Sequence, residues 1–256
     1  MMLLRVLHAE MLKMRRTIAL RMVVLAPGVV VLLVLFITSQ APFSALHRNG
    51  IKDEWIGVAN LSLFFWALLM MPLYVTLESA LIAGLDHSEN HWKSLLARPV
   101  PRWTFPVTKL IVVMAMTAAG TLVLLCGILL SGAILPKIQP EVHFGLPVPW
   151  RALVRDYAQV LGLMFLPLTI QQWVSLRWKS FSVATSTGIV ATVVAFFAVA
   201  ASRAVPGWPQ YFPWALPMLV LVKQPHNIAA TLAISGVLGL LVAAASCRDF
   251  CRHEVT

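Results

Sequence analysis

Residues 106–134 read PVTKLIVVMAMTAAGTLVLLCGILLSGAI, and this run carries a single charged residue, Lys109. A bilayer core about 30 Å thick needs about 20 mostly apolar residues to cross it as a helix. The run is long enough for one complete span, and its extra length allows tilt or projection beyond the membrane. The stretch therefore predicts that the protein folds in a lipid bilayer.

Five further apolar runs lie on either side of this one. Only 12% of all residues are charged and 59% are hydrophobic, whereas soluble proteins carry about 25% charged residues. We therefore expect residues 1–256 to form a single all-α integral membrane domain. The six predicted transmembrane helices lie at about 22–39, 56–77, 106–134, 157–176, 182–202 and 228–246.

The net charge of +10 is shared unequally between the two sides of these spans. Cytoplasmic loops carry the excess of Lys and Arg, so both termini are predicted to be cytoplasmic. This distribution suits membrane topology and contact with membrane lipids, and no nucleic-acid partner is expected. The larger group of cations comprises Arg5, Lys13, Arg15, Arg16, Arg21, Lys93, Arg98, Arg102, Lys109, Arg177, Lys179, Arg248 and Arg252.

Residues 1–21 precede the first span and have an amphipathic pattern. Leu4, Leu7, Met11 and Met14 share one helical face, and the cationic side chains lie largely on the other faces. This pattern predicts an interfacial helix on the membrane surface, near anionic headgroups. A flanking segment that only obeys the topology rule is the alternative.

Between the fifth and sixth spans, residues 204–227 read AVPGWPQYFPWALPMLVLVKQPHN. Prolines alternate with aromatic side chains, so the segment is too broken for a full span and too aromatic for an aqueous loop. It predicts a re-entrant outer segment of short helices. The aromatic residues form either an outer gate or an ordinary interface belt, and they are Trp208, Tyr211, Phe212 and Trp214.

Residues 85–103, LDHSENHWKSLLARPVPRW, form the charged loop between the second and third spans. Asp86 followed by Glu89 is a capping-box pattern that favours a helix start. Pro99 and Pro101 end any helix that begins there. We therefore predict a short cytoplasmic helix at about 86–98.

One side of this short helix is apolar, because Trp92, Leu95 and Leu96 follow the i, i+3, i+4 spacing. A helix of two to three turns is marginal by itself. We expect its apolar side to dock on a cytoplasmic partner, and a solvated loop is the alternative.

Two catalytic or metal-binding interpretations of the same loop are weaker. His87 and His91 stand at i, i+4 around Glu89, but the pattern differs from H-E-x-x-H and has no third ligand nearby. Lys93 with Arg98 and Pro99 resembles the Lys…Arg-Pro element of membrane lipid phosphatases, but the spacing is shorter and no matching histidine motif follows. We expect neither a metal site nor a catalytic site.

The order of these elements resembles the ABC-2 type permease family over essentially the whole chain. The resemblance rests on Ala9-Glu10-Met11-Leu12-Lys13, on the second span ending in Glu78, and on PVPRWTFPVTK at 99–109. Residues 171–181, QQWVSLRWKSF, look most like permeases of peptide-antibiotic export and self-immunity, such as those for lantibiotics and bacitracin.

The resemblance implies a transport subunit rather than an enzyme. The chain has no G-x-x-x-x-G-K-[ST] loop, so we do not expect it to hydrolyse ATP alone. No cofactor is expected on this chain, and ATP and magnesium are expected on its partner. The implied partners are two ABC ATPase subunits and a second permease chain, identical or homologous, in the cytoplasmic (inner) membrane of a bacterium. The first choice of cargo is an antimicrobial peptide, and a lipid or lipid-linked glycan is the alternative. Outside transport, the alternatives are a membrane-embedded enzyme and a membrane assembly protein.

The resemblance also implies roles for individual residues. The helix at about 86–98 becomes the coupling helix that contacts the ATPase. Glu78, near the inner end of the second span, is costly to place there and is expected to pair with Lys109, Arg177 or Lys179, or to face water. The implied ATPase-coupling residues are Glu89, Trp92, Lys93, Leu95, Leu96 and Arg98.

Overall fold

The computed structural model describes residues 2–15, 17–40, 54–88, 101–139, 144, 148–201, 208–221 and 227–252. This part of the chain is helical, with six helices long and apolar enough to cross a membrane, which confirms the predicted all-α membrane fold. They are Ile18–Gln40, Glu54–Leu85, Thr104–Ile138, Trp150–Arg177, Phe181–Ala200 and Ile228–Arg252. The labelled elements are α1 (Met2–Met14), α2 (Ile18–Gln40), α4 (Glu54–Phe65), η1 (Trp66–Met70), α5 (Met71–Ser88), α7 (Thr104–Ile138), α8 (Trp150–Leu163), α9 (Phe165–Arg177), α10 (Phe181–Ala200), η3 (Trp208–Tyr211), η4 (Pro213–Val220) and α11 (Ile228–Arg252).

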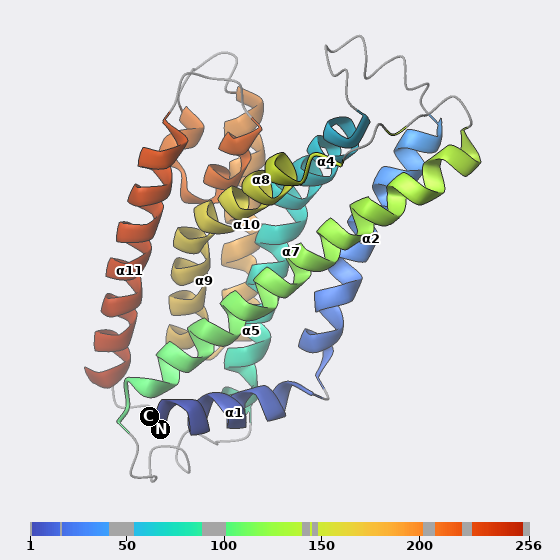
Figure 1. The fold of residues 1–256 in the computed structure, drawn as a ribbon. Coiled ribbons are helices and arrows are strands. Elements are labelled where there is room, and N and C mark those ends of the chain that lie inside the picture. The colour runs from blue at the N-terminus through green and yellow to red at the C-terminus, as the bar shows by residue number, and fades with distance from the viewer. Residues whose placement is uncertain are drawn as a thin grey trace.

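Figure 1 shows how the helices are arranged. The longest helix, α7, crosses the bundle obliquely, with α2 on one side and α11 at the opposite edge. Helix α1 lies across one end of the bundle, where α11 also ends, and we call this the α1 end. Helices α4 and α8 begin at the other end, which we call the opposite end.

Small residues let the helices approach closely. A Cβ atom added at Gly120 of α7 would lie 3.6 Å from the carbonyl oxygen of Val23 on α2. A Cβ atom at Gly188 of α10 would lie only 2.1 Å from Oγ1 of Thr76 on α5. Close backbone approach of this kind is the usual basis of helix association in lipid.

The second span contains a π-helical turn that follows from one proline. In a regular α-helix the N–H of residue 72 would bond to the carbonyl of Leu68, but Pro72 has no N–H. The N–H of Met71 bonds instead to the carbonyl of Trp66, which gives the π-helix η1. The Trp66 side chain is fully buried there, and its Nε1 donates to Oγ1 of Thr121 on α7 at 3.3 Å.

The fourth span is broken into α8 and α9 for a similar reason. Pro167 cannot donate to the carbonyl of Leu163, which is its α-helical partner. The hydroxyl of Ser235 on α11 donates to this carbonyl at 3.2 Å, and also lies 3.3 Å from the carbonyl of Gly162. Its oxygen accepts from the N–H of Leu166 at 3.4 Å. Ser235 thus supplies the partners that backbone groups need at membrane depth.

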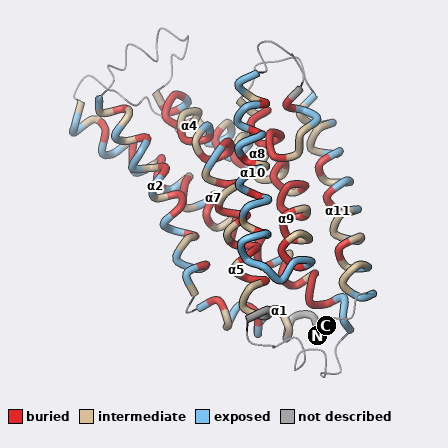
Figure 2. Tube along the Cα trace, turned by 180° about the vertical axis from the view of Figure 1, so that it is seen from behind, coloured by how far each residue is buried: buried red, intermediate tan, exposed pale blue. Residues whose placement is uncertain are grey.

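The aromatic stretch before the sixth span forms two short 3-10 helices, η3 and η4, at the opposite end. The sequence predicted short helices here; their position in a membrane remains a prediction. Figure 2 shows that buried residues line the middle of the bundle, whereas α2, α10 and α11 carry long exposed stretches. Because these exposed side chains are largely apolar, they are suited to contact lipid.

Candidate functional site

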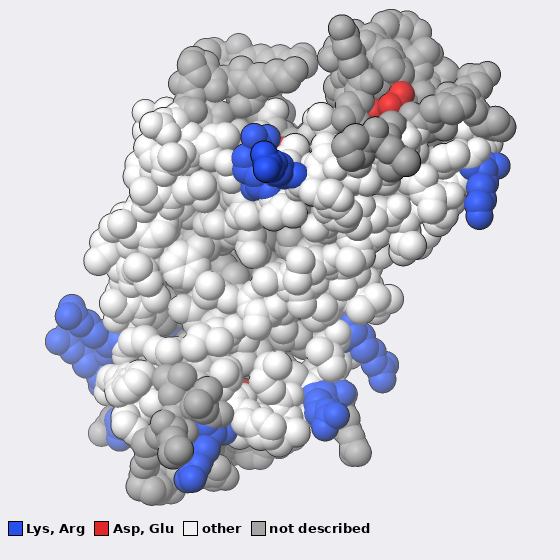
Figure 3. Space-filling view, in the orientation of Figure 1, with Lys and Arg blue, Asp and Glu red and all other residues white. Residues whose placement is uncertain are grey.

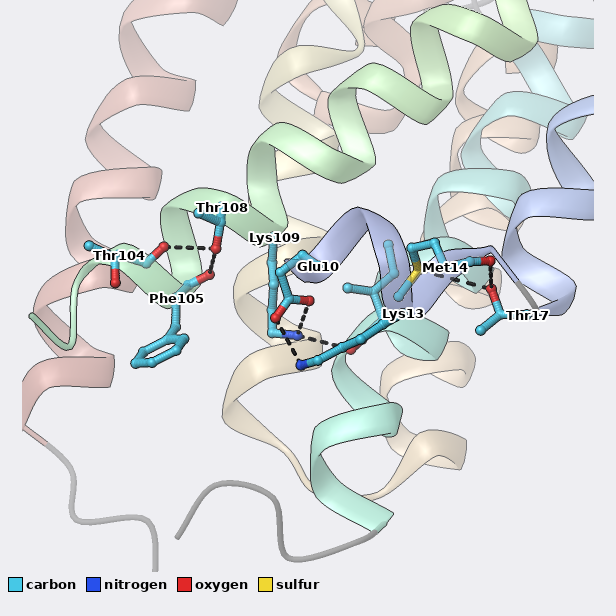
Figure 4. Close-up of polar contacts among 9 residues, drawn as sticks. Glu10, Lys13, Met14, Thr17, Thr104, Phe105, Thr108 and Lys109 are labelled. Carbon is cyan, nitrogen blue, oxygen red and sulfur yellow. Dashed lines mark hydrogen bonds and ion pairs between the residues drawn. The ribbon is translucent and has the colours of Figure 1, made fainter. Parts of the chain in front are cut away.

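A buried ion pair joins three elements at the α1 end (Figure 4). The ammonium of Lys109, on the first turns of α7, lies 3.5 Å from the Glu10 carboxylate on α1. It also donates to the carbonyl of Ile82 on α5 at 3.1 Å. Only 1% of the Lys109 side chain and 3% of the Glu10 side chain are exposed. We call Glu10, Lys109 and the Ile82 carbonyl the α1–α5–α7 junction.

Glu10 is shared with a second cation. Lys13, one turn further along α1, donates to the other carboxylate oxygen at 3.0 Å, and its side chain is one third exposed. Charge-assisted bonds of this kind are stronger than neutral ones. The carboxylate therefore has one buried and one partly exposed cationic partner, which compensates its desolvation.

The ion pair also decides which face of α1 turns inward. The pattern of Leu4, Leu7, Met11 and Met14 predicted one apolar face, but Met11 is exposed while Glu10 and Met14 are buried. The face toward the bundle is rotated because Glu10 must reach Lys109. The spacing of apolar residues alone does not reveal which face of α1 turns toward the bundle.

The turn between α1 and α2 is short and held by Thr17. Its hydroxyl donates to the carbonyl of Met14 at 2.9 Å, and its N–H donates to the same carbonyl at 3.0 Å (Figure 4). Met14 is buried beside the start of α2. A movement of α1 is therefore passed directly to the first span.

A second polar link closes the same end between α9 and α11. Asp249 accepts from Nε1 of Trp173 at 3.0 Å and lies 3.7 Å from Nε of Arg177. Arg177 is partly exposed, so this ion pair contributes less to the free energy of unfolding than the buried α1–α5–α7 junction. The two links involve α1, α5, α7, α9 and α11.

The predicted coupling helix falls mainly outside the described residues, and so do Glu89, Trp92, Lys93, Leu95, Leu96 and Arg98. Its expected start differs from the structure, because α5 runs on without a break to Ser88. Asp86 therefore lies inside α5. The structure describes the two helix ends on either side of this segment, the end of α5 and the start of α7. Lys109 of α7 joins them by donating to the carbonyl of Ile82 on α5.

Glu78 lies one turn before Ile82 on α5, and its side chain is fully buried. Neither carboxylate oxygen accepts a hydrogen bond from the described residues. Two of the three expected cations pair elsewhere, Lys109 with Glu10 and Arg177 with Asp249. Glu78 is therefore a buried acid set apart from the ion pairs of the α1 end.

The proposed outer-gate residues do not share one environment. Trp214 is buried, and its ring lies 6.0 Å from that of the partly buried Phe212. Tyr211 is 82% exposed. Trp208 begins η3. The structure thus separates a packed Phe212–Trp214 pair from an exposed Tyr211.

A family model described as "ABC-2 family transporter protein" matches residues 6–203. The chain belongs to the ABC-2 transporter family. This ABC-2 protein is therefore the multi-pass membrane permease component of an ABC transporter, and it associates with ATPase partners. Its family role is that of a transport subunit. Searches among curated proteins and solved structures gave no match.

The junction at Glu10 is the part of this site that the sequence prediction missed. Two signals for it were present, because Lys109 is the single charge in residues 106–134 and Glu10 is the single acid in α1. A charge in a membrane segment requires a partner. The sequence instead suggests Lys109 as one of three possible partners of Glu78, which is closer to it in the chain than Glu10.

Proposed function

We propose that this ABC-2 permease exports a hydrophobic or amphipathic cargo, with an antimicrobial peptide as first choice, and that the α1–α5–α7 junction transmits the ATPase movement. The mechanism rests on one observation: Lys109 forms a hydrogen bond to Glu10 and another to the Ile82 carbonyl. Ile82 and Lys109 flank the predicted coupling helix, which by family resemblance contacts the ATPase, so the second bond ties its two ends together.

A push on this segment acts on α5 and α7 together. Lys109 is buried, so the three helices separate only by leaving a charge unpaired in an apolar site, which costs several kcal/mol. The elements therefore move as one body. Helix α1 follows through Glu10, and α2 follows through the Thr17 turn. In this mechanism Trp92, Leu95 and Leu96 hold the ATPase, while Glu89, Lys93 and Arg98 make rim contacts.

The cargo class follows from the interior of the bundle. The buried hydroxyls of Thr117, Thr121 and Thr169 donate to carbonyls of their own helices, and Gln171 donates to the Ala184 carbonyl at 2.8 Å. These groups stabilise helices. Among the described residues, buried polar atoms without a hydrogen-bond partner lie on α5 and α9, at Glu78, Ser79, Gln172 and Ser175, and these four residues include a single ionisable group. We therefore place the pathway between two permease chains, where apolar helix faces suit an amphipathic cargo.

The distribution of charge supports a cytoplasmic location of both termini. Lys and Arg gather at the α1 end in α1, α2, α7, α9 and α11, and Figure 3 shows most of the blue surface of this view in its lower part. Among the described residues, the opposite end carries Lys137, Arg151 and Arg155. By the positive-inside rule the α1 end faces the cytoplasm, as in a bacterial inner membrane.

The test uses the permease reconstituted with its cognate ATPase in liposomes. Lys109→Met is expected to lower cargo-stimulated ATP hydrolysis and transport while the ATPase still copurifies. The charge-reversed pair Glu10→Lys with Lys109→Glu should recover part of the loss. Lys137→Met, which removes an exposed cation from the other end of α7, is the matched control. Full transport by Lys109→Met at normal expression would refute the mechanism, and failure of any ATPase to copurify would refute the assembly.

A further inference from the structure

An apolar groove of about 480 Å³ opens between α7, the α8–α9 break and α11. Small residues form much of its wall, including Ala118, Ala158, Gly162 and Gly236. Gly236 has free space where a side chain would stand, because no atom lies within 4 Å of an added Cβ. The groove exists because Pro167 breaks the fourth span and turns α8 away from the line of α9.

Two arginines lie above this groove on the same helix. Arg151 and Arg155 are exposed, and their positions at i and i+4 share one face of α8 with Ala158 and Gly162 at i+7 and i+11. By the helical rise, Arg155 is about 10 Å and Arg151 about 16 Å from Gly162 along the axis. The cationic pair therefore stands at the opposite end of the bundle, directly in line with the groove.

The pair retains binding capacity for an anion. The Nε–H of Arg155 donates a hydrogen bond to the Asp156 carboxylate at 2.8 Å, which leaves the terminal nitrogens of the guanidinium for another acceptor. In Figure 3 a blue cluster lies over the region of α8, and the surface below it through the middle of the molecule is uncharged. This face thus joins a cationic patch at the opposite end to an apolar groove nearer the middle of the bundle.

A ligand that matches both parts has a phosphate at one end and a hydrocarbon chain at the other. Guanidinium groups bind phosphate oxygens through paired N–H donors. A volume of about 480 Å³ accepts one hydrocarbon chain but not a folded peptide segment with its side chains. A second copy of the chain is a poorer occupant, because it has a net charge of +10 and would bring cations toward this patch.

We propose that this groove is a binding site for an anionic phospholipid, with one acyl chain between α7, α8 and α11 and the phosphate at Arg151 and Arg155. The site is formed by a single chain and does not depend on the proposed export mechanism. Bound lipid fills the space beside the broken span and holds α8 against α11.

The test is lipid retention by the full-length permease taken from nanodiscs of phosphatidylcholine and phosphatidylglycerol in equal amounts. Native mass spectrometry after transfer to detergent counts the lipids that stay bound. We expect one phosphatidylglycerol per chain to be retained in preference to phosphatidylcholine. Arg151→Gln with Arg155→Gln should reduce this retention about 10- to 30-fold, while Lys137→Gln at the same end leaves it unchanged.

A second pair of variants tests the groove separately from the arginines. Gly236→Leu fills the free space and should abolish retention. Gly28→Leu on α2 is the matched control, since Gly28 also has no atom within 4 Å of an added Cβ and lies outside the groove. Unfolding midpoints measured without added lipid verify that each variant is folded.

Three results would overturn the inference. They are equal retention of the two lipids, equal loss in the Lys137→Gln control, and conversion of a dimer to a monomer by Gly236→Leu with lipid retention unchanged. The last result would assign the groove to a second copy of the chain. None of them bears on export, which the ATPase-coupled assay measures independently.

Discussion

The ammonium of Lys109 lies 3.5 Å from the carboxylate of Glu10, although 99 residues separate them in the chain. Both side chains are almost fully buried, so each is the counter-charge that makes the burial of the other tolerable. This relationship connects the N-terminal helix α1 to the start of the longest span.

Removing one member of this pair should strongly destabilise the permease. We expect Lys109→Met to cost about 3 kcal/mol, because among the described residues Glu10 then keeps the partly exposed Lys13 alone. Lys13→Met should cost less than about 1 kcal/mol, because that pair is screened by solvent. The midpoint of thermal unfolding in detergent measures both, and equal midpoints for the two variants would contradict the assignment of the buried pair as dominant.

Ser235 should stabilise the broken fourth span through its bonds to the backbone of α8 and α9. Ser235→Ala leaves the carbonyl of Leu163 without its hydroxyl partner and should cost about 1–3 kcal/mol. Ser131→Ala is the control, because that hydroxyl only supplements the helical bonding of the Gly127 carbonyl. If both variants unfold at the same temperature, the bridge from α11 contributes nothing.

The contact of Gly188 with Thr76 should make α10 intolerant of even one added methyl group. Gly188→Ala places a carbon 2.1 Å from the Thr76 hydroxyl oxygen, and Thr76 is β-branched and bonded to the Pro72 carbonyl. We expect a loss of about 1–3 kcal/mol. Gly28→Ala, at a site with open space, should be neutral or slightly stabilising.

A compensating change separates steric conflict from helix propensity at this contact. Thr76→Ala removes the two nearest atoms, Oγ1 and Cγ2, but keeps Cβ at 2.7 Å, so the double variant with Gly188→Ala should regain part of the lost unfolding temperature. Additive losses in the double variant would show that the two residues do not meet.

Glu78 should prove dispensable for stability. It is fully buried, and its nearest polar neighbour is the Tyr74 hydroxyl one turn earlier on α5, which does not reach full hydrogen-bond geometry. Replacing Glu78 with Met therefore removes a desolvation cost at the loss of one weak contact. We expect Glu78→Met to unfold at the same or a higher temperature. A lower unfolding temperature would reveal a stabilising partner, and lost transport with retained stability would assign Glu78 to function.

The six spans were predictable because a helix in lipid needs about 20 apolar residues, and that property is local in sequence. The distortions within them were not, although Pro72 and Pro167 are visible. A proline marks a missing N–H, but the local helix geometry depends on which group bonds to the carbonyl that the proline leaves free. Near Pro72 the chain shifts to a π-turn, whereas at Pro167 a serine 68 residues further on supplies the bond.

The candidate site was predictable only in part for the same reason. Glu78 and Lys109 are conspicuous as charges in apolar sequence, but pairing depends on which helix faces are apposed. The partner of Lys109 comes from α1, whose inward face is turned to present Glu10 rather than Met11. Amphipathic periodicity identifies the helix and not this rotation.

The bridge from Ser235 also bears on how the protein is assembled. Synthesis delivers the fourth span to the membrane before α11 exists, so the carbonyl of Leu163 enters the bilayer without the hydroxyl that later satisfies it. The fourth span can settle into its kinked form only when the final helix arrives. A ribosome-released chain that lacks α11 should therefore keep an unsatisfied carbonyl in its fourth span.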